Sequence, residues 1–139
     1  MWVLLWFVPA FLAATEIDIY TEGRISVNKL SFKPGKKVAI GVRFDDNFFP
    51  ENFAKKKILD QYQLPATWYL NRLEKKKEIE LAKKLVSGLH APGLHGHSHY
   101  YLYELNRNQI FYELMMNRLM LECELDQDIR TFGIPFLKS

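Results

Sequence analysis

The strongest constraint on the fold is an alternation between apolar runs of strand length and segments with helical periodicity. Residues 38–44 are mostly apolar, contain β-branched side chains and no proline, and are typical of a buried parallel strand. Residues 66–70 form a second run of this kind. Helical periodicity follows each run, in residues 54–62 and 74–87. This order predicts an α/β fold, in which helices connect the parallel strands of a sheet or barrel.

The spacing of apolar residues predicts which helical faces are buried. The first helix is expected to bury Ala54, Ile58, Leu59 and Tyr62. The second is expected to bury Ile79, Ala82, Leu85 and Val86, and to end near Gly88. A third helix, from residue 108, is expected to bury one stripe: Tyr112, Met115, Met116, Leu119, Met120 and Cys123.

Three histidines lie within five residues, at positions 95, 97 and 99. His95 and His99 are four residues apart, so both rings can project to one side of a helical turn, whereas His97 points elsewhere. Neutral imidazole is the commonest protein ligand of zinc, and a carboxylate as third ligand leaves one coordination position for water. The alternative is a polar surface turn beside Gly96 and Ser98.

Two adjacent aspartates follow the first apolar run. Asp45 and Asp46 therefore lie at the carboxyl end of a strand, where α/β folds place their ligands and catalytic groups. Neighbouring side chains point in different directions, so one aspartate can bind a metal while the other accepts a proton. The alternative is an Asp-Asp-Asn turn that caps a helix before Pro50.

Together these motifs resemble those of polysaccharide deacetylases of the NodB-homology type, which form carbohydrate esterase family four. Residues 43–47 read Arg-Phe-Asp-Asp-Asn, where the family has Thr-Phe-Asp-Asp-Gly. Residues 95–99 match the family's His-(Ser/Thr)-x-x-His, except that Gly96 replaces the hydroxyl residue. Residues 65–70, Pro-Ala-Thr-Trp-Tyr-Leu, resemble the family's second strand.

The resemblance implies a partial, distorted (β/α) barrel with parallel strands, truncated after about the third or fourth strand–helix unit. It also implies removal of N-acetyl groups from a glycan by water that a divalent metal, usually zinc, activates. Asp45 matches the catalytic base of the family. Asp46, His95 and His99 match its three metal ligands.

Several residues depart from the family pattern. Gly133 stands where a third motif has an arginine that orients the catalytic aspartate, and Phe136 replaces a tyrosine. Arg43 or Arg130 is hypothesised to supply the missing guanidinium. Pro92 predicts a third strand that is short, bulged or interrupted. The general acid of the family has no counterpart before residue 139, so the alternative is a truncated, non-catalytic metal-binding, sugar-binding or interaction module.

The chain has 139 residues, 48% of them hydrophobic, enough for one domain with a core. We expect a signal-like or anchor segment at 1–14, a hairpin or extension at 15–37 and a partial deacetylase domain at 38–139. The alternative for 1–14 is a buried segment. A signal or anchor predicts a secreted or membrane-associated protein.

The expected partner is an N-acetylated glycan. A net charge of +3 is too small to indicate nucleic acid. An N-terminal membrane anchor and self-association through an open barrel edge are further expectations, the latter because unpaired strand edges and uncovered apolar surface promote association.

Overall fold

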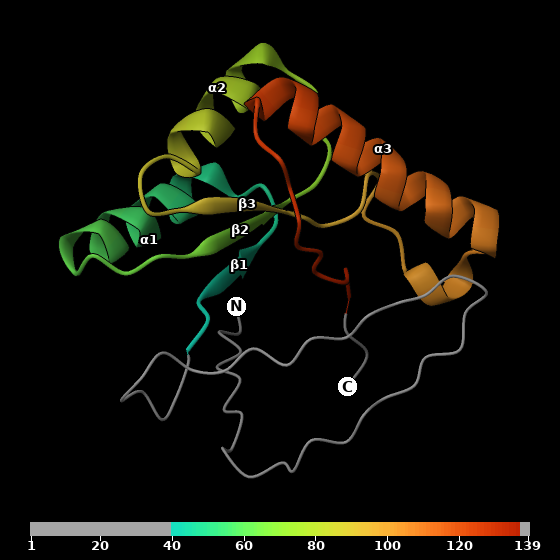
Figure 1. Ribbon diagram of the computed structural model, residues 1–139, viewed down its shortest axis with the longest axis horizontal. Coiled ribbons are helices and arrows are strands. Elements are labelled where there is room, and N and C mark those ends of the chain that lie inside the picture. The colour runs from blue at the N-terminus through green and yellow to red at the C-terminus, as the bar shows by residue number, and fades with distance from the viewer. Residues whose placement is uncertain (1–39, 137–139) are drawn as a thin grey trace, which may run out of the picture. The chain divides into compact units, whose positions relative to one another are not determined.

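The computed structural model describes residues 40–136, and its helices and strands belong to one compact unit that begins at Val42. In chain order the elements are β1 (Arg43–Asp45), α1 (Phe49–Gln61), β2 (Thr67–Leu70), α2 (Lys76–Leu85), β3 (Ala91–Leu94), the 3₁₀ helix η1 (Leu102–Glu104) and α3 (Arg107–Leu125) (Figure 1). The predicted segments 1–14 and 15–37 lie outside the described residues, so the predicted domain division stays a prediction.

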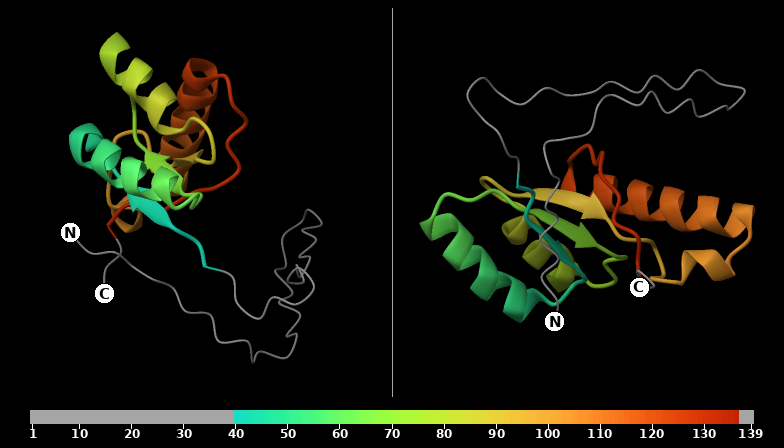
Figure 2. Two further views of the ribbon diagram at one scale, coloured as in Figure 1. Left: turned by 90° about the vertical axis from the view of Figure 1, so that its left-hand side faces the viewer. Right: turned by 90° about the horizontal axis from the view of Figure 1, so that it is seen from below.

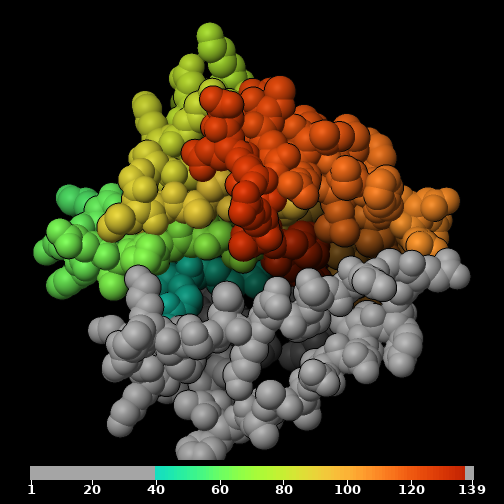
Figure 3. Space-filling model, viewed as in Figure 1, coloured from blue at the N-terminus to red at the C-terminus, as the bar shows by residue number. Residues whose placement is uncertain are grey.

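The three strands form one parallel sheet in the order β1-β2-β3. Phe44 lies opposite Trp68, and Trp68 lies opposite Pro92. After α3 the chain returns beside β3, where Phe132 makes a single parallel bridge with Leu94. Figure 3 shows this red C-terminal segment crossing the unit beside the orange residues of α3. The prediction of a partial barrel of parallel strands joined by helices is confirmed.

The hydrophobic core lies between the sheet and the helices. Along β2, Trp68 and Leu70 are fully buried, whereas Thr67 and Tyr69 point to the other face of the sheet and are half-buried. All three α-helices contribute to the same core, as their arrangement in the two views of Figure 2 illustrates. Its helical members are Phe49 and Leu59 of α1, Ala82 and Leu85 of α2, and Leu121 and Leu125 of α3.

Pro92 does not interrupt the third strand. Backbone N–H groups before and after Pro92 donate to β2. The Ala91 N–H donates to the Ala66 carbonyl (3.0 Å), and the His95 N–H donates to the Leu70 carbonyl (3.1 Å). Residue 94 is two positions after Pro92, so the two backbone nitrogens point in the same direction. The Leu94 N–H points away from β2 and donates to the Thr131 carbonyl (2.9 Å). The nitrogen of Pro92 therefore faces away from β2, where the missing N–H removes no bond from the β2–β3 ladder.

The inward face of α1 differs from the predicted one. Leu59 is buried as expected, but Ala54, Ile58 and Tyr62 are exposed. The buried face instead starts at the first helical residue, Phe49, and includes Asn52, which is fully buried. The difference arises because a polar side chain, Asn52, lies on this face and breaks the hydrophobic periodicity.

The predicted buried stripe of α3 is also wrong. Its buried residues recur every four positions: Glu113, Asn117, Leu121 and Leu125. The predicted members Tyr112, Met115, Leu119 and Cys123 are exposed. Half of the buried face is polar because Glu113 and Asn117 bind the loop after β3.

The second helix behaves as predicted, with Ala82, Leu85 and Val86 buried. None of the helices in the described range is long and apolar enough to cross a membrane.

Two leucines of α3 test this assignment of the buried face. Leu121 is fully buried, whereas Leu119 is 57% exposed. We expect Leu121→Ala to lower the free energy of unfolding by about 2–5 kcal/mol, because it removes core contacts and leaves a cavity. Leu119→Ala should change it by less than about 1 kcal/mol. Urea unfolding followed by circular dichroism measures both, and equal losses would show that the helix is rotated from its described position.

Candidate functional site

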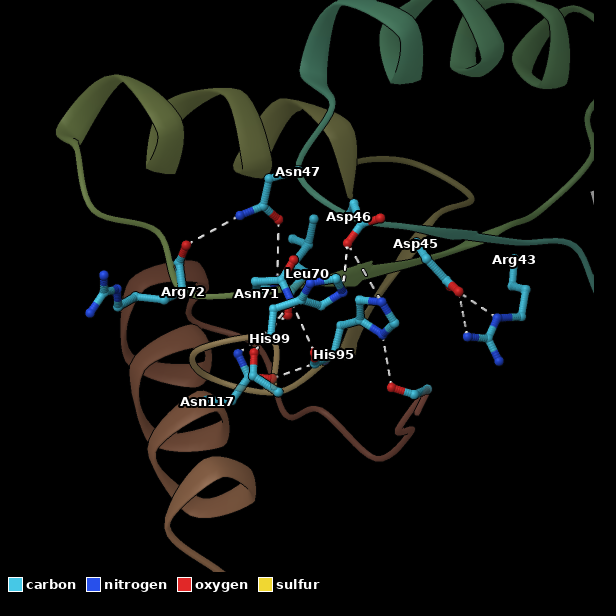
Figure 4. Close-up of polar contacts among 12 residues, drawn as sticks. Arg43, Asp45, Asp46, Asn47, Leu70, Asn71, Arg72, His95, His99 and Asn117 are labelled. Carbon is cyan, nitrogen blue, oxygen red and sulfur yellow. Dashed lines mark hydrogen bonds and ion pairs between the residues drawn. The ribbon is translucent and has the colours of Figure 1, made fainter. Parts of the chain in front are cut away.

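Three predicted ligand residues meet at the carboxyl edge of the sheet. Asp46 directly follows β1, and His95 directly follows β3. Asp46 Oδ1 lies 3.0 Å from His99 Nε2 and 3.6 Å from His95 Nε2 (Figure 4). The ligand atoms of the three residues all lie within 4.8 Å of one another. Among residues 40–136, no other group of three His, Cys, Asp or Glu side chains is this close.

The ring of His95 is held with one nitrogen free for a ligand. Its Nδ1 lies 2.8 Å from the backbone oxygen of Gly133. A carbonyl oxygen only accepts hydrogen bonds, so Nδ1 carries the proton and Nε2 presents its lone pair to Asp46. Burial lowers the pKa of His95 despite the hydrogen bond to Gly133 and the charges of Asp45 and Asp46, which act in the opposite direction. The lowered pKa favours the neutral ring, which is the form that binds a metal.

Three residues at the site have positive φ angles. Asp46 and His99 have φ angles of 72° and 56°, in the left-handed region that side chains rarely occupy, and Gly96 has 81°. Two contacts hold Asp46 in this conformation: its N–H donates to Tyr69 O (3.0 Å), and its carbonyl accepts from Asn52 Nδ2 (3.0 Å). Such strained conformations concentrate at functional sites, where the surrounding structure maintains them.

Asparagine side chains fix the backbone around His95. Asn117 Oδ1 accepts the His95 N–H (2.9 Å), while its Nδ2 donates to Leu70 O (3.2 Å). Asn71 Nδ2 donates to the His95 carbonyl (2.9 Å). Asn47 does not cap α1; its Oδ1 accepts from the Asn71 N–H (3.2 Å), which joins the loops after β1 and β2.

Glu113 holds the other half of the histidine loop. This buried carboxylate accepts the Ser98 N–H through Oε2 (2.7 Å), and its backbone carbonyl accepts the His97 N–H (3.2 Å). His97 is buried and meets the edge of Tyr112, with 6.0 Å between ring centroids, and it takes no part in the ligand group. None of these anchors was identified from the sequence. Polar residues four apart in an apolar helix were the available signal.

Asp45 points away from Asp46 and pairs with Arg43. Arg43 Nε and Nη2 donate to the two carboxylate oxygens at 3.0 and 2.7 Å, a bidentate pair (Figure 4). The two residues are two apart in β1, so they share one face of the strand. The guanidinium also lies over the Tyr69 ring, 4.6 Å from its centroid. Arg130, the other hypothesised partner, is bonded to Asp128 instead.

The glycine at position 133 leaves room for this arrangement. A Cβ atom there would lie 2.6 Å from Arg43 Nη2 and 2.9 Å from Tyr69 Cδ1. Any side chain at this position therefore conflicts with the observed places of Arg43 and Tyr69. A guanidinium from β1 occupies the space, so the absence of arginine at position 133 does not leave Asp45 without a cationic partner.

The donor set fits a divalent transition metal. One carboxylate and two imidazoles suit zinc and similar ions, and three protein ligands leave a position open. The carbonyl of Gly133 behind His95 Nδ1 is the kind of outer partner that orients a metal-bound histidine. Asp45 lies outside the ligand group, so its carboxylate is available for another role.

Asn117 offers a test of how the loop is held. We expect Asn117→Ala to lower the free energy of unfolding by about 1–3 kcal/mol, because it leaves buried backbone groups with fewer hydrogen bonds. Exposed Asn108→Ala on the same helix is the matched control and should change it by less than about 0.5 kcal/mol. Chemical denaturation of the two variants measures this difference; no difference would mean that Asn117 does not anchor the loop.

Solved structures with the same fold come from carbohydrate esterases. A mutant, with restored enzymatic activity, of a CE4 family pseudoenzyme from Bacillus anthracis is 26% identical, with a TM-score of 0.62 over 68% of this chain and 35% of that chain. The peptidoglycan deacetylase PdaC from Bacillus subtilis is 18% identical, with a TM-score of 0.60 over 67% and 46%. A family 4 carbohydrate esterase from Streptomyces lividans, in complex with acetate, is 18% identical, with a TM-score of 0.58 over 68% and 50%.

The chain spans about a third to a half of the length of these structures. No curated protein matched it. The family model for polysaccharide deacetylases matches residues 32–139, which include both aspartates, both histidine ligands and the Gly133 segment. The chain therefore belongs to the polysaccharide deacetylase family.

Proposed function

We propose that this chain carries the metal site and the catalytic base of a hydrolase that removes N-acetyl groups from a glycan. Asp46, His95 and His99 hold a divalent ion, with zinc the expected metal, and Asp45 is the base. One observation carries the proposal: three ligand atoms within 4.8 Å adjoin a second carboxylate that has its own cationic partner. A site with separate ligand and base carboxylates is suited to hydrolysis.

The metal ligands and Asp45 have separate roles in the proposed reaction. A bound divalent ion would supply Lewis acidity, which activates water and stabilises negative charge on the carbonyl oxygen. Asp45 accepts the proton of the attacking water, and Arg43 fixes the direction in which its carboxylate points. The side chain of Asp45 is 37% exposed, so it can reach a water molecule on the solvent side.

A metal- or sugar-binding module without turnover is the second candidate. It is favoured by the likeness to a structure described as a CE4 family pseudoenzyme and by the departures at Asn47 and Gly133. No other histidine of the described range is placed as a general acid, because His90 pairs with Asp60 and His97 is buried against Tyr112. The Arg43–Asp45 pair supports the catalytic candidate, because it orients a carboxylate that takes no part in the ligand group.

We also infer that the substrate is polymeric and lies outside the cytoplasm. The likeness to a peptidoglycan deacetylase supports an N-acetylated polymer outside the cytoplasm as substrate. A secretory signal or membrane anchor at residues 1–14 agrees with such a substrate and stays a prediction, as does self-association through the open edge of the sheet.

Metal content tests the ligand assignment. We expect about one zinc per folded native chain, since three protein ligands make one catalytic-type site. His99→Ala should lose the metal while circular dichroism shows that the fold persists. Asp45→Asn is the matched control, because it changes the neighbouring carboxylate that is not a ligand; it should keep the zinc and lose acetate release from N-acetylglucosamine oligomers.

Two results would contradict this assignment. A folded native chain without bound zinc would favour the non-catalytic candidate. Loss of zinc in Asp45→Asn together with retention in His99→Ala would show that Asp45 is a metal ligand and that His99 is not.

Arg43 is tested through turnover at constant metal content. Arg43→Ala should retain zinc and lower acetate release by about 10–100-fold, the scale expected when a catalytic group is misplaced by about an ångström. Gly133→Ala should give a similar loss by displacing the guanidinium, because its Cβ would meet Arg43 Nη2 at 2.6 Å. Arg130→Ala is the control and should retain full activity. Unchanged turnover in Arg43→Ala would remove Arg43 from the mechanism.

A further inference from the structure

The ring of Tyr69 lies against the arginine that pairs with the proposed base. Tyr69 is opposite Asp45 in the β1–β2 register, so the two residues are neighbours on the sheet. The Arg43 guanidinium carbon lies 4.6 Å from the centroid of the Tyr69 ring, while two guanidinium nitrogens bond the Asp45 carboxylate at 3.0 and 2.7 Å. A cation within about 6 Å of an aromatic face is attracted to it. The guanidinium therefore has two partners, a carboxylate and an aromatic ring.

The carboxylate alone is a weak anchor for this guanidinium. The side chains of Arg43 and Asp45 are 30% and 37% exposed, so water screens the attraction between them. A long arginine side chain also loses rotamer freedom when it is fixed in one geometry, which opposes the pair. A ring against the guanidinium restricts the movement of this planar group, so the bidentate pair is kept in one orientation.

Two glycines leave the space that the Tyr69 ring occupies. A Cβ atom at Gly93, the residue opposite Tyr69 on β3, would lie 2.6 Å from both Cδ1 and Cε1 of the ring. A Cβ atom at Gly133, in the segment beside β3, would lie 2.9 Å from Cδ1. Real Cβ atoms essentially never come this close to another atom. A side chain at either position would therefore push the ring from its place against Arg43.

The face of the Tyr69 ring, not its hydroxyl group, makes the contact with Arg43. Among residues 40–136 the hydroxyl has no hydrogen-bond partner. His95 is the other aromatic neighbour, with 6.5 Å between ring centroids, but the bond from its Nδ1 to the Gly133 carbonyl already fixes that ring. Arg43 is thus the side chain whose position depends on the Tyr69 ring.

We propose that Tyr69 is a positioning residue for the catalytic base: its ring holds the Arg43 guanidinium, which in turn orients the Asp45 carboxylate. The inference rests on the proposed function, in which Asp45 accepts the proton of the attacking water. Gly93 and Gly133 take part because they leave room for the ring. The Tyr69 side chain makes no hydrogen bond to a proposed metal ligand in the described part of the chain, so its effect on the reaction passes through Arg43.

Substitutions of Tyr69 test the role of the ring. Tyr69→Phe keeps the aromatic face and should retain acetate release from N-acetylglucosamine oligomers. Tyr69→Leu removes the face and should lower kcat by about tenfold with KM and zinc content unchanged, because a misdirected base affects the reaction only after the substrate has bound. Gly93→Ala should give a similar loss by displacing the ring. Gly41→Ala, where the new Cβ would have no atom within 4 Å, is the matched control.

A double variant shows whether Tyr69 acts through Arg43. If the ring only holds the guanidinium, Tyr69→Leu should cause no further loss once Arg43 is replaced by alanine. Arg43→Ala/Tyr69→Leu should therefore match Arg43→Ala in turnover. A further tenfold loss in the double variant would overturn the proposal and assign the ring to packing or substrate contact. Equal losses in Tyr69→Phe and Tyr69→Leu, or full activity in Tyr69→Leu, would also overturn it.

A spectroscopic measurement separates this inference from the proposed function. The ring current of Tyr69 should shift the NMR signal of the Arg43 side-chain Nε–H upfield. We expect this shift in the native chain and in Tyr69→Phe, and its loss in Tyr69→Leu and Gly93→Ala. The same pattern of shifts in a zinc-loaded chain that releases no acetate would support the positioning of Arg43 by Tyr69 while the proposed chemistry fails. An unshifted signal in an active native chain would overturn the positioning role and leave the proposed function standing.

Discussion

Two hydrogen bonds to the end of β2 hold the halves of the candidate site together. The Tyr69 carbonyl accepts the Asp46 N–H at 3.0 Å, and the Leu70 carbonyl accepts the His95 N–H at 3.1 Å. Asp46 and His95 are far apart in the sequence, but they flank the same strand because parallel strands bring their carboxyl ends to one edge. The central strand thus positions ligands that it does not itself supply.

The two aspartates show how one turn can serve two purposes. Asp46 adopts a left-handed conformation and points to the histidines, whereas Asp45 remains in β1 and points to Arg43. Arg43 depends on Gly133, since a side chain there would occupy its place. Asp45 therefore keeps a bidentate cationic partner although the arginine of the third motif is absent.

The sequence predicted the parts of the structure that depend on local pattern. Strand-length apolar runs located β1 and β2, and the motifs located Asp46, His95 and His99. The buried faces of α1 and α3 were missed because fully buried Asn52 and Asn117 break the hydrophobic periodicity. Their roles are contacts to backbone far along the chain, which no local pattern contains. The choice between Arg43 and Arg130 likewise required three-dimensional distances.

The most direct test of the central claim is to locate the metal in a crystal of the zinc-loaded protein by anomalous scattering at the zinc edge. We expect one strong peak within bonding distance of Asp46 Oδ1, His95 Nε2 and His99 Nε2, with His95 Nδ1 still bonded to the Gly133 carbonyl. A peak that Asp45 ligates in place of Asp46, or one at the His90–Asp60 pair with none at the strand ends, would contradict it.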